Sequence, residues 1–395
     1  MPVVVNESGR GECLGLGEKF AEFTILAAQP FTQRNLDRFG ATWLLKHAKK
    51  VHLVDASSVV WGDTAVETDE SDAVDGVLRP KTWEELEPLF QKSQGSLLIQ
   101  YLAPYMVEPL FELASRYSIS ICCFDMGRIP ATRSFAKRIV SGVKRLVSDP
   151  KSLLQRAQGL DAPATAIDFL VLSGRDCDLK PTPWRKMART VVPSHSYDYV
   201  IWKEAAPFVH PEPYIVFLDQ AKENHPHWKT LYGYNPFERR GYYSQIETLL
   251  RRLSDTYGMP VLVALHQRSP DKDPRPYNGF QTFQDRTPSL VKGASLVVVQ
   301  DSTAVSFAVL GRKPVVFVEM PEQRTVWQKG NVTRDMSDLL GSPVVRPGSR
   351  RLPSPGHLQV DESKYSAYEA MYIRHPSCTG TPVWDRVFGV SAPRI

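Results

Sequence analysis

The sequence lacks the features that mark several common protein classes. Its five cysteines are scattered over 395 residues and form no C-x-x-C pair. This argues against a disulfide framework and a structural zinc site, and it fits a reducing compartment. No apolar run is long enough to span a bilayer, and no basic region followed by a long apolar run marks a secretory signal. We therefore expect a cytoplasmic protein.

The charge excess is also small. A net charge of +5 with a pI near 8.8 is too weak to indicate nucleic-acid binding, and no zinc-finger or RNP-like motif supports it. The excess is compatible with attraction to anionic lipid or to an anionic substrate. Residues 131–158 form a basic amphipathic segment. A helix face packed on the protein is favoured there over a membrane-surface helix, and peripheral contact with the inner membrane stays open.

Several catalytic and cofactor motifs are missing. The chain contains neither a P-loop nor a G-x-G-x-x-G sequence after a strand, and neither G-x-S-x-G nor H-E-x-x-H occurs. Two D-x-D triplets, at Asp176–Asp178 and Asp271–Asp273, could hold a divalent metal against a sugar nucleotide. Both lie in segments crowded with Lys, Arg and Pro. We therefore predict no metal and no resident cofactor.

The alternation of strand-like and helix-like segments is what the sequence does offer. Length favours two domains, and 42% hydrophobic residues allow two sizeable cores. Short apolar runs followed by helical patterns predict parallel sheets with helices on both faces. The expected fold is α/β, with two Rossmann-like domains facing each other across a cleft. Residues 1–190 would form the acceptor-binding domain and residues 191–395 the nucleotide-sugar-binding domain, and the C-terminal tail could cross back.

The strands of both halves are expected at definite positions. In the first half we expect a long helix through Leu36–Ala48 and an irregular, proline-rich approach to the linker at Pro181–Pro193. The expected strands of the two halves are 23–28, 51–55, 96–101, 119–124, 166–172, 214–218, 260–265, 295–299 and 314–318.

Polar residues follow three of these segments. Asp219 ends the first strand of the second half and could be a nucleophile, a general base or a helix cap. His266 and Arg268 leave the next strand together, which suits a phosphate or carboxylate ligand, although a surface loop is equally compatible. His195 and Ser196 precede another apolar step near the expected hinge, where a histidine is more often structural than catalytic.

The segment Gln300–Leu310 reads as the end of a strand, a hydroxyl-bearing turn and an apolar helix. Asp301, Ser302 or Thr303 could cap that helix and leave its first N–H groups pointing outward. A helix N-terminus at the carboxyl end of a parallel strand favours a phosphate. An ordinary helix cap explains the same residues and is slightly favoured when they are considered alone.

In chain order, these segments resemble bacterial surface-polysaccharide glycosyltransferases of the GT-B fold. The resemblance is carried by His195-Ser196-x-Asp198-Tyr199, Tyr214 to Asp219, His266-Gln267-Arg268, Thr287-x-x-Leu290-Val291, Asp301-Ser302-Thr303-Ala304 and Lys313-Pro314-Val315-Val316-Phe317. In particular it points to the retaining β-Kdo transferases of lipopolysaccharide O-antigen and capsule assembly. These enzymes use CMP-β-Kdo, the activated form of a keto-sugar acid. The resemblance covers roughly residues 194–318.

The resemblance implies a role for each matching position. Asp219 would be the nucleophile that forms a covalent glycosyl-enzyme intermediate, and His195 a general base or a contact to the donor carboxylate. The residues that would hold the CMP-sugar are Ser196, His266, Arg268, Gln300, Ser302 and Thr303. This chain has His266-Gln267 where many CMP-sugar transferases have His-Pro, and Gln300 or Asp301 where a histidine is usual. The partners would be a nucleotide-sugar donor, a glycan or glycolipid acceptor and other polysaccharide-assembly enzymes.

Two other functions remain open. One keeps the fold and changes the donor, as in a sialyltransferase-like, CDP-glycerol-type or UDP-sugar enzyme. The other is a non-catalytic polysaccharide-assembly protein that has kept the fold. Neither the acceptor nor the oligomeric state follows from the residues.

Overall fold

The protein consists of two compact units. The computed structural model describes residues 3–4, 15–62, 74–102, 108–127, 130, 167–175, 185, 187–224, 234–237, 241–266, 277–326, 332–378 and 383–389. The first unit contains Met1–Met126, Ala157–Tyr197 and Arg374–Ile395, and the second contains Gly127–Arg156 and Asp198–Ile373. The sequence placed the boundary at residue 190, whereas the chain passes between the units at Tyr197–Asp198 and returns to the first unit at Arg374.

Every strand pair in the first unit's sheet is parallel. Within the described residues the order is β1-β7-β6-β5-β4-β2-β3. The chain goes from β2 to β3 on one side and then to β4 on the other, so the strand order reverses between β2 and β4. The strands are β1 Val3–Val4, β2 Glu22–Ala27, β3 Lys50–Asp55, β4 Leu97–Gln100, β5 Ser120–Asp125, β6 Ile167–Ser173 and β7 Ala188–Ser194.

The helix expected through Leu36–Ala48 is wrong as one element. It is two helices that meet at Gly40, where φ is +72° and any side chain would collide with the ring of Trp384. Glycine reaches this left-handed conformation without a steric penalty, so the chain turns there. The helices of the first unit are α1 Leu16–Lys19, α2 Gln33–Arg38, α3 Ala41–His47, α4 Ser57–Trp61, η3 Glu84–Leu86, α5 Glu87–Lys92, α6 Glu108–Arg116, η9 Pro376–Cys378 and α18 Val383–Phe388.

The segment Pro181–Pro193, expected to be irregular, contains β7 in its second half. Pro193 pairs with Leu172 of β6, and β1 extends only as far as Val191 of β7. Proline cannot donate to a strand ladder and therefore favours an edge. Here the Pro193 carbonyl accepts a 3.0 Å hydrogen bond from Arg386 Nε instead of a bond from a strand.

The second unit has a parallel sheet in the order β10-β9-β8-β11-β12-β13 within the described residues. Counted from its first strand, this is 3-2-1-4-5-6, the order of the dinucleotide-binding Rossmann fold. The prediction of two Rossmann-like α/β domains is confirmed. The strands are β8 Ile215–Leu218, β9 Val261–Ala264, β10 Gln281–Phe283, β11 Leu296–Val299, β12 Val315–Val318 and β13 Val344–Val345.

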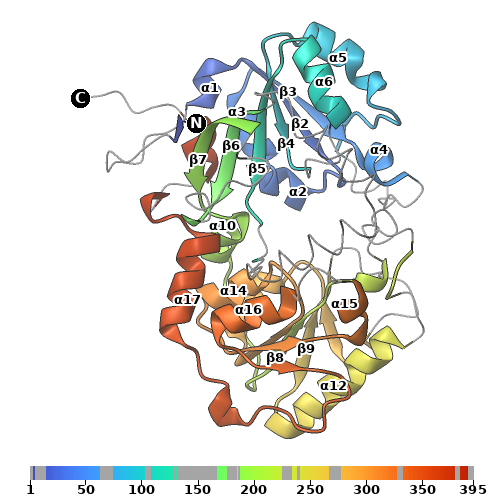
Figure 1. Cartoon of the computed structure of the whole chain (residues 1–395), viewed down its shortest axis with the longest axis vertical. Helices are drawn as coiled ribbons and strands as arrows, with labels where there is room; N and C mark the ends of the chain where they lie inside the picture. The colour runs from blue at the N-terminus through green and yellow to red at the C-terminus, as the bar shows by residue number, and fades with distance from the viewer. Residues whose placement is uncertain are drawn as a thin grey trace, which may run out of the picture. The chain divides into compact units, whose positions relative to one another are not determined.

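Helices cover both faces of this second sheet (Figure 1). α12 packs its leucines on Phe217 and Val263, while α13, α14, α16 and α17 pack on Val216, Leu262 and Val297. Because both faces are buried, the strands are continuous apolar runs. The helices of this unit, the first of which begins at the boundary, are α10 Tyr197–Glu204, η6 Lys222–Asn224, α12 Tyr242–Tyr257, α13 Thr287–Gly293, α14 Val305–Leu310, α15 Pro321–Val326, α16 Val332–Leu340, η7 Pro355–His357, α17 Glu362–Tyr368 and η8 Glu369–Ile373.

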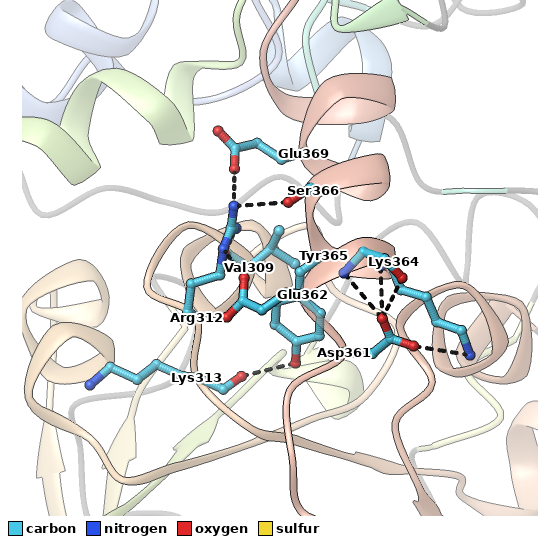
Figure 2. Close-up of polar contacts among 10 residues, drawn as sticks. Val309, Arg312, Lys313, Asp361, Glu362, Lys364, Tyr365, Ser366 and Glu369 are labelled. Carbon is cyan, nitrogen blue, oxygen red and sulfur yellow. Dashed lines mark hydrogen bonds and ion pairs between the residues drawn. The ribbon is translucent and has the colours of Figure 1, made fainter.

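The helix that leads back to the first unit is fastened to the end of α14 (Figure 2). Arg312 has a φ of +50° and contacts Glu362 at 3.0 Å and Glu369 at 2.9 Å. The hydroxyl of Tyr365 donates a 2.9 Å hydrogen bond to the Lys313 carbonyl. These contacts hold α17 against the second unit up to the π-helical residues Glu369–Ile373, directly before the chain crosses to the first unit.

Candidate functional site

The most promising site lies where the strand order of the second unit reverses. β8 and β11 are neighbours, but the chain leaves β8 for β9 on one side and reaches β11 on the other. In open α/β sheets, ligands bind outside the carboxyl ends of the strands at such a point. Asp219 directly follows β8, and Gln300 directly follows β11. Two residues predicted from sequence are therefore on adjacent strand ends, about 4.8 Å apart.

Asp219 is held by donors from three segments of the second unit. Its Oδ1 accepts hydrogen bonds from the Ala221 N–H at 3.1 Å and from the Tyr277 hydroxyl at 2.6 Å. Its Oδ2 accepts one from the His266 N–H at 3.1 Å. The side chain is buried, at 6% exposure. The carboxylate is thus oriented by fixed neighbours and joins the ends of β8 and β9.

Tyr277 is the strongest of these donors. It is 1% exposed and has a φ of +65°, an uncommon conformation for a bulky residue. Burial, aided by the charge of Asp219, raises the pKa of Tyr277 well above its usual value. Its hydroxyl therefore stays protonated at neutral pH and keeps donating to the carboxylate. No pattern in the sequence singled out this residue, because it follows a segment rich in proline and charge.

Gln300 brings a buried amide to the same edge. It is 0% exposed, and its Oε1 accepts a 2.9 Å hydrogen bond from the Tyr242 hydroxyl. Its Nε2 has no hydrogen-bond partner among the described residues. A buried donor without an acceptor costs about 1–3 kcal/mol. Such a group is suited to receive a ligand acceptor at the end of β11.

Asp301 and Lys222 form a buried ion pair across the same two strand ends. Lys222 lies in the short helix after β8, and Asp301 follows Gln300. The Lys222 ammonium also lies 5.1 Å from the ring centroid of Phe237. Burial lowers the pKa of Lys222, and the charge of Asp301 acts in the opposite direction. Sequence reasoning missed this pair, although Lys222 follows the singled-out Asp219 by only three positions.

The predicted cap of the helix after β11 is wrong. α14 begins at Val305 and has only six residues, and its N-cap is Ala304, without a side-chain bond. Ser302 Oγ instead accepts a 3.2 Å hydrogen bond from the Ala304 N–H in the preceding turn, and Asp301 is engaged by Lys222. Thr303 is half-buried. The hydroxyl side chains therefore belong to a turn ahead of a short helix.

The remaining predicted residues are distributed differently. His266 contributes its backbone N–H to Asp219, and Arg268 lies outside the described residues. His195 and Ser196 are buried in the first unit, where His195 forms a β-bridge with Arg374. The second unit therefore brings together Asp219, the backbone of His266 and Gln300.

A second charged cluster, not anticipated from sequence, follows β12 and β13. Glu319 is 1% exposed and accepts from Arg334 at 3.0 and 3.1 Å and from Arg346 at 2.7 Å. Burial alone would raise its pKa, but the hydrogen bonds of the two arginines outweigh that effect and lower the pKa of Glu319 to about 2. The available sequence signal was a carboxylate directly after a buried strand, the same signal that singled out Asp219.

Metal and membrane features are also absent from the described part of the chain. No group of three or more His, Cys, Asp or Glu residues there is placed to hold a metal ion. Both D-x-D triplets lie outside the described residues. Nor does any helix found among the described ranges have the length and apolar character needed to cross a bilayer.

Comparison with known proteins gives only distant structural similarity. No protein-family model and no curated sequence matches the chain. The UDP-GlcNAc 2-epimerase of Methanocaldococcus jannaschii, in complex with UDP-GlcNAc and UDP, has a TM-score of 0.44 at 10% identity and covers 88% of this chain and 98% of its own. The glycotransferase of kitacinnamycin has a TM-score of 0.46 at 10% identity, covering 93% of each chain. The MnaA–UDP structure from S. aureus has a TM-score of 0.46 at 12% identity and covers 91% of this chain and 92% of its own. Similarities at this level assign neither an activity nor a ligand.

Proposed function

We propose that this protein is a metal-independent glycosyltransferase that moves Kdo from CMP-β-Kdo to a saccharide acceptor with retention, in O-antigen or capsule biosynthesis. One observation carries the proposal. Asp219 and Gln300 occupy neighbouring strand ends at the reversal point of a sheet with the strand order of nucleotide-binding proteins. The sequence resemblance that names CMP-Kdo involves the same two strand ends.

The nucleotide would bind along the carboxyl ends of β8 and β11. The unpartnered Nε2 of Gln300 offers a donor to an acceptor atom of the ligand. The hydroxyls of Ser302 and Thr303, in the turn before α14, are half-buried and offer further contacts. CMP leaves as a phosphate monoester, which needs less charge neutralisation than a diphosphate, so amide, hydroxyl and cationic donors suffice without a metal.

Asp219 would act as the nucleophile. Its carboxylate attacks the anomeric carbon of Kdo, the bond from that carbon to the phosphate oxygen breaks, and CMP departs with the electron pair. The acceptor hydroxyl then attacks the same carbon and loses its proton to a base, and the bond to Asp219 breaks. Two inversions give net retention. The role of His195, as a general base or a contact to the donor carboxylate, stays a prediction from the sequence.

The contacts of Asp219 suit this role. Tyr277 and the His266 N–H hold the carboxylate in one orientation. A positioned nucleophile needs no reorganisation as the transition state forms, and positioning is a major source of rate enhancement. Both of these donors are neutral groups.

Incubation of the protein with CMP-Kdo and a synthetic saccharide acceptor, with a chelator present, tests the proposal. Transfer of Kdo with retention is the expected result. Turnover of a sialic acid donor or a UDP-sugar without turnover of CMP-Kdo would show that the donor assignment is wrong. Calorimetry that detects no nucleotide binding would instead favour a non-catalytic assembly protein.

A further inference from the structure

Arg346 is a half-exposed arginine that is held in place at both ends. Its backbone closes a turn, because the Ser349 N–H donates to the Arg346 carbonyl and the Arg346 N–H donates to Ser349 Oγ, each at 2.9 Å. Pro347 and Gly348 occupy the middle of that turn, as the turn type favours. Arg252 of α12 donates to the Pro347 carbonyl at 3.2 Å. The loop after β13 is therefore tied to the body of the second unit.

The guanidinium of Arg346 is fixed by Glu319. Its Nε donates a 2.7 Å hydrogen bond to Glu319 Oε2, and its side chain is 42% exposed while that of Glu319 is 1% exposed. Glu319 also accepts hydrogen bonds from two nitrogens of Arg334. An exposed arginine normally samples many rotamers, and fixing it in advance removes that entropic cost from ligand binding.

Only some of the hydrogen-bond donors of Arg346 are engaged by Glu319. Two nitrogens of Arg334 donate to Glu319, and the nearby charge of Asp338 also stabilises the charged Arg334 guanidinium. Arg346 donates to Glu319 only through Nε, and its two terminal nitrogens have no acceptor among the described residues. An arginine fork matches the geometry of a phosphate or a carboxylate through two parallel hydrogen bonds.

Arg346 directly follows β13, at the same carboxyl edge as the proposed nucleotide site. β13 is two places from β11 in the sheet, so the two strand ends are about 10 Å apart. We propose that the Nη edge of Arg346, oriented by Glu319, binds an oxyanion of the substrate. The group is either the phosphate of the nucleotide or the carboxylate of the keto-acid sugar. This assignment rests on the proposed function and names a further residue of its site.

Binding measurements on purified protein test the proposal with four ligands: CMP, cytidine, free Kdo and inorganic phosphate. Arg346→Gln should weaken the oxyanion-bearing ligand about tenfold, the effect of losing one charge-assisted contact, and leave cytidine unaffected. If only the affinity for CMP falls, Arg346 binds the nucleotide phosphate. If only the affinity for Kdo falls, Arg346 binds the sugar carboxylate. Unchanged affinity for CMP, Kdo and phosphate would overturn the proposal.

Two further variants keep the result interpretable. Arg312→Gln is the matched control. Arg312 lies between α14 and β12, at the amino end of the strands, and pairs with Glu362 and Glu369. Its loss should leave the affinity for every ligand unchanged. Arg346→Lys keeps an ion pair with Glu319 if Arg346→Gln fails to fold. A lysine ammonium beside Glu319 cannot present two parallel donors to the anion, so this variant should also bind the anion more weakly, and wild-type affinity in it would contradict the role of the fork. Wild-type protein that binds phosphate through Arg346 but neither CMP nor Kdo would refute the proposed function and leave the anion site standing.

Discussion

The hydroxyl of Tyr277 donates a 2.6 Å hydrogen bond to Asp219 Oδ1, and both side chains are buried at the carboxyl end of β8. Burial raises the pKa of Tyr277 well above its usual value, so this donor does not titrate at neutral pH. The orientation of the Asp219 carboxylate therefore depends on a neutral partner from a distant part of the sequence. This dependence can be tested by removing one oxygen atom.

Tyr277→Phe removes the hydroxyl and keeps the ring. We expect the rate of Kdo transfer to fall by about 10- to 150-fold, because a hydrogen bond to a charged group contributes about 1.5–3 kcal/mol. The dissociation constant for CMP should change little, because the hydroxyl contacts Asp219 and not Gln300. Steady-state kinetics with calorimetry separates the two quantities. A large loss of CMP affinity with an unchanged rate would contradict an orienting role.

Asp219→Asn should abolish turnover and preserve CMP binding. The amide oxygen can still accept from Ala221 and Tyr277, but the amide nitrogen then faces the His266 N–H as a second donor. We expect that mismatch to lower the free energy of unfolding by about 1–3 kcal/mol. Thermal unfolding should accompany the assay so that a folded variant is confirmed. Persistent transfer at the wild-type rate would exclude Asp219 as the nucleophile.

Lys222→Met removes one member of a buried ion pair. Breaking such a pair from one side costs about 3–5 kcal/mol, because the remaining charge is left in a poorly solvated environment. The double variant Lys222→Met with Asp301→Leu should recover much of this loss, since the burial of both charges is then avoided. Urea unfolding of the wild type, of Lys222→Met, of Asp301→Leu and of the double variant measures the coupling. Equal stability of the single and double variants would show that the pair is not coupled.

The lowered pKa of Glu319 predicts how the free energy of unfolding changes at acidic pH. Its pKa is lowered from the usual value of 4.5 to about 2 in the folded protein. A lowered carboxyl pKa stabilises the fold fully above the unfolded pKa and loses that contribution as the pH falls towards the folded pKa. The contribution is at most about 3 kcal/mol, reduced by the partial exposure of both arginines.

Glu319→Gln should therefore be less stable than the wild type at neutral pH, and the difference should shrink between about pH 4.5 and pH 2. Free energies of unfolding measured in urea across that range provide the check. A difference that stays constant down to pH 2 would contradict the lowered pKa.

The strands of both sheets could be predicted well because burial on both faces leaves long apolar runs. Ile215–Leu218 and Leu296–Val299 are examples. The elements that were missed have weaker signals. β10 is three residues long, β13 is two, and β7 contains Pro193. Short edge strands and prolines have tertiary causes that local periodicity does not report.

The site was predictable to the extent that strand ends are predictable. Asp219 and Gln300 follow recognisable strands, and the reversal of strand order places them side by side. Tyr277 was missed because it reaches the edge from a loop whose path depends on the whole unit, and Arg346 was missed because it follows β13, a strand of only two residues. Their partners, Asp219 and Glu319, follow strands directly. The carboxylates were thus accessible from sequence and their donors were not.

The mass of the intact protein after brief mixing with CMP-Kdo is the most direct measurement. A gain equal to one Kdo residue, located by peptide mapping on Asp219 and missing in Asp219→Asn, is the predicted result. Kdo transfer that proceeds without any adduct on the wild-type protein, or with the adduct on a different residue, would contradict double displacement through Asp219.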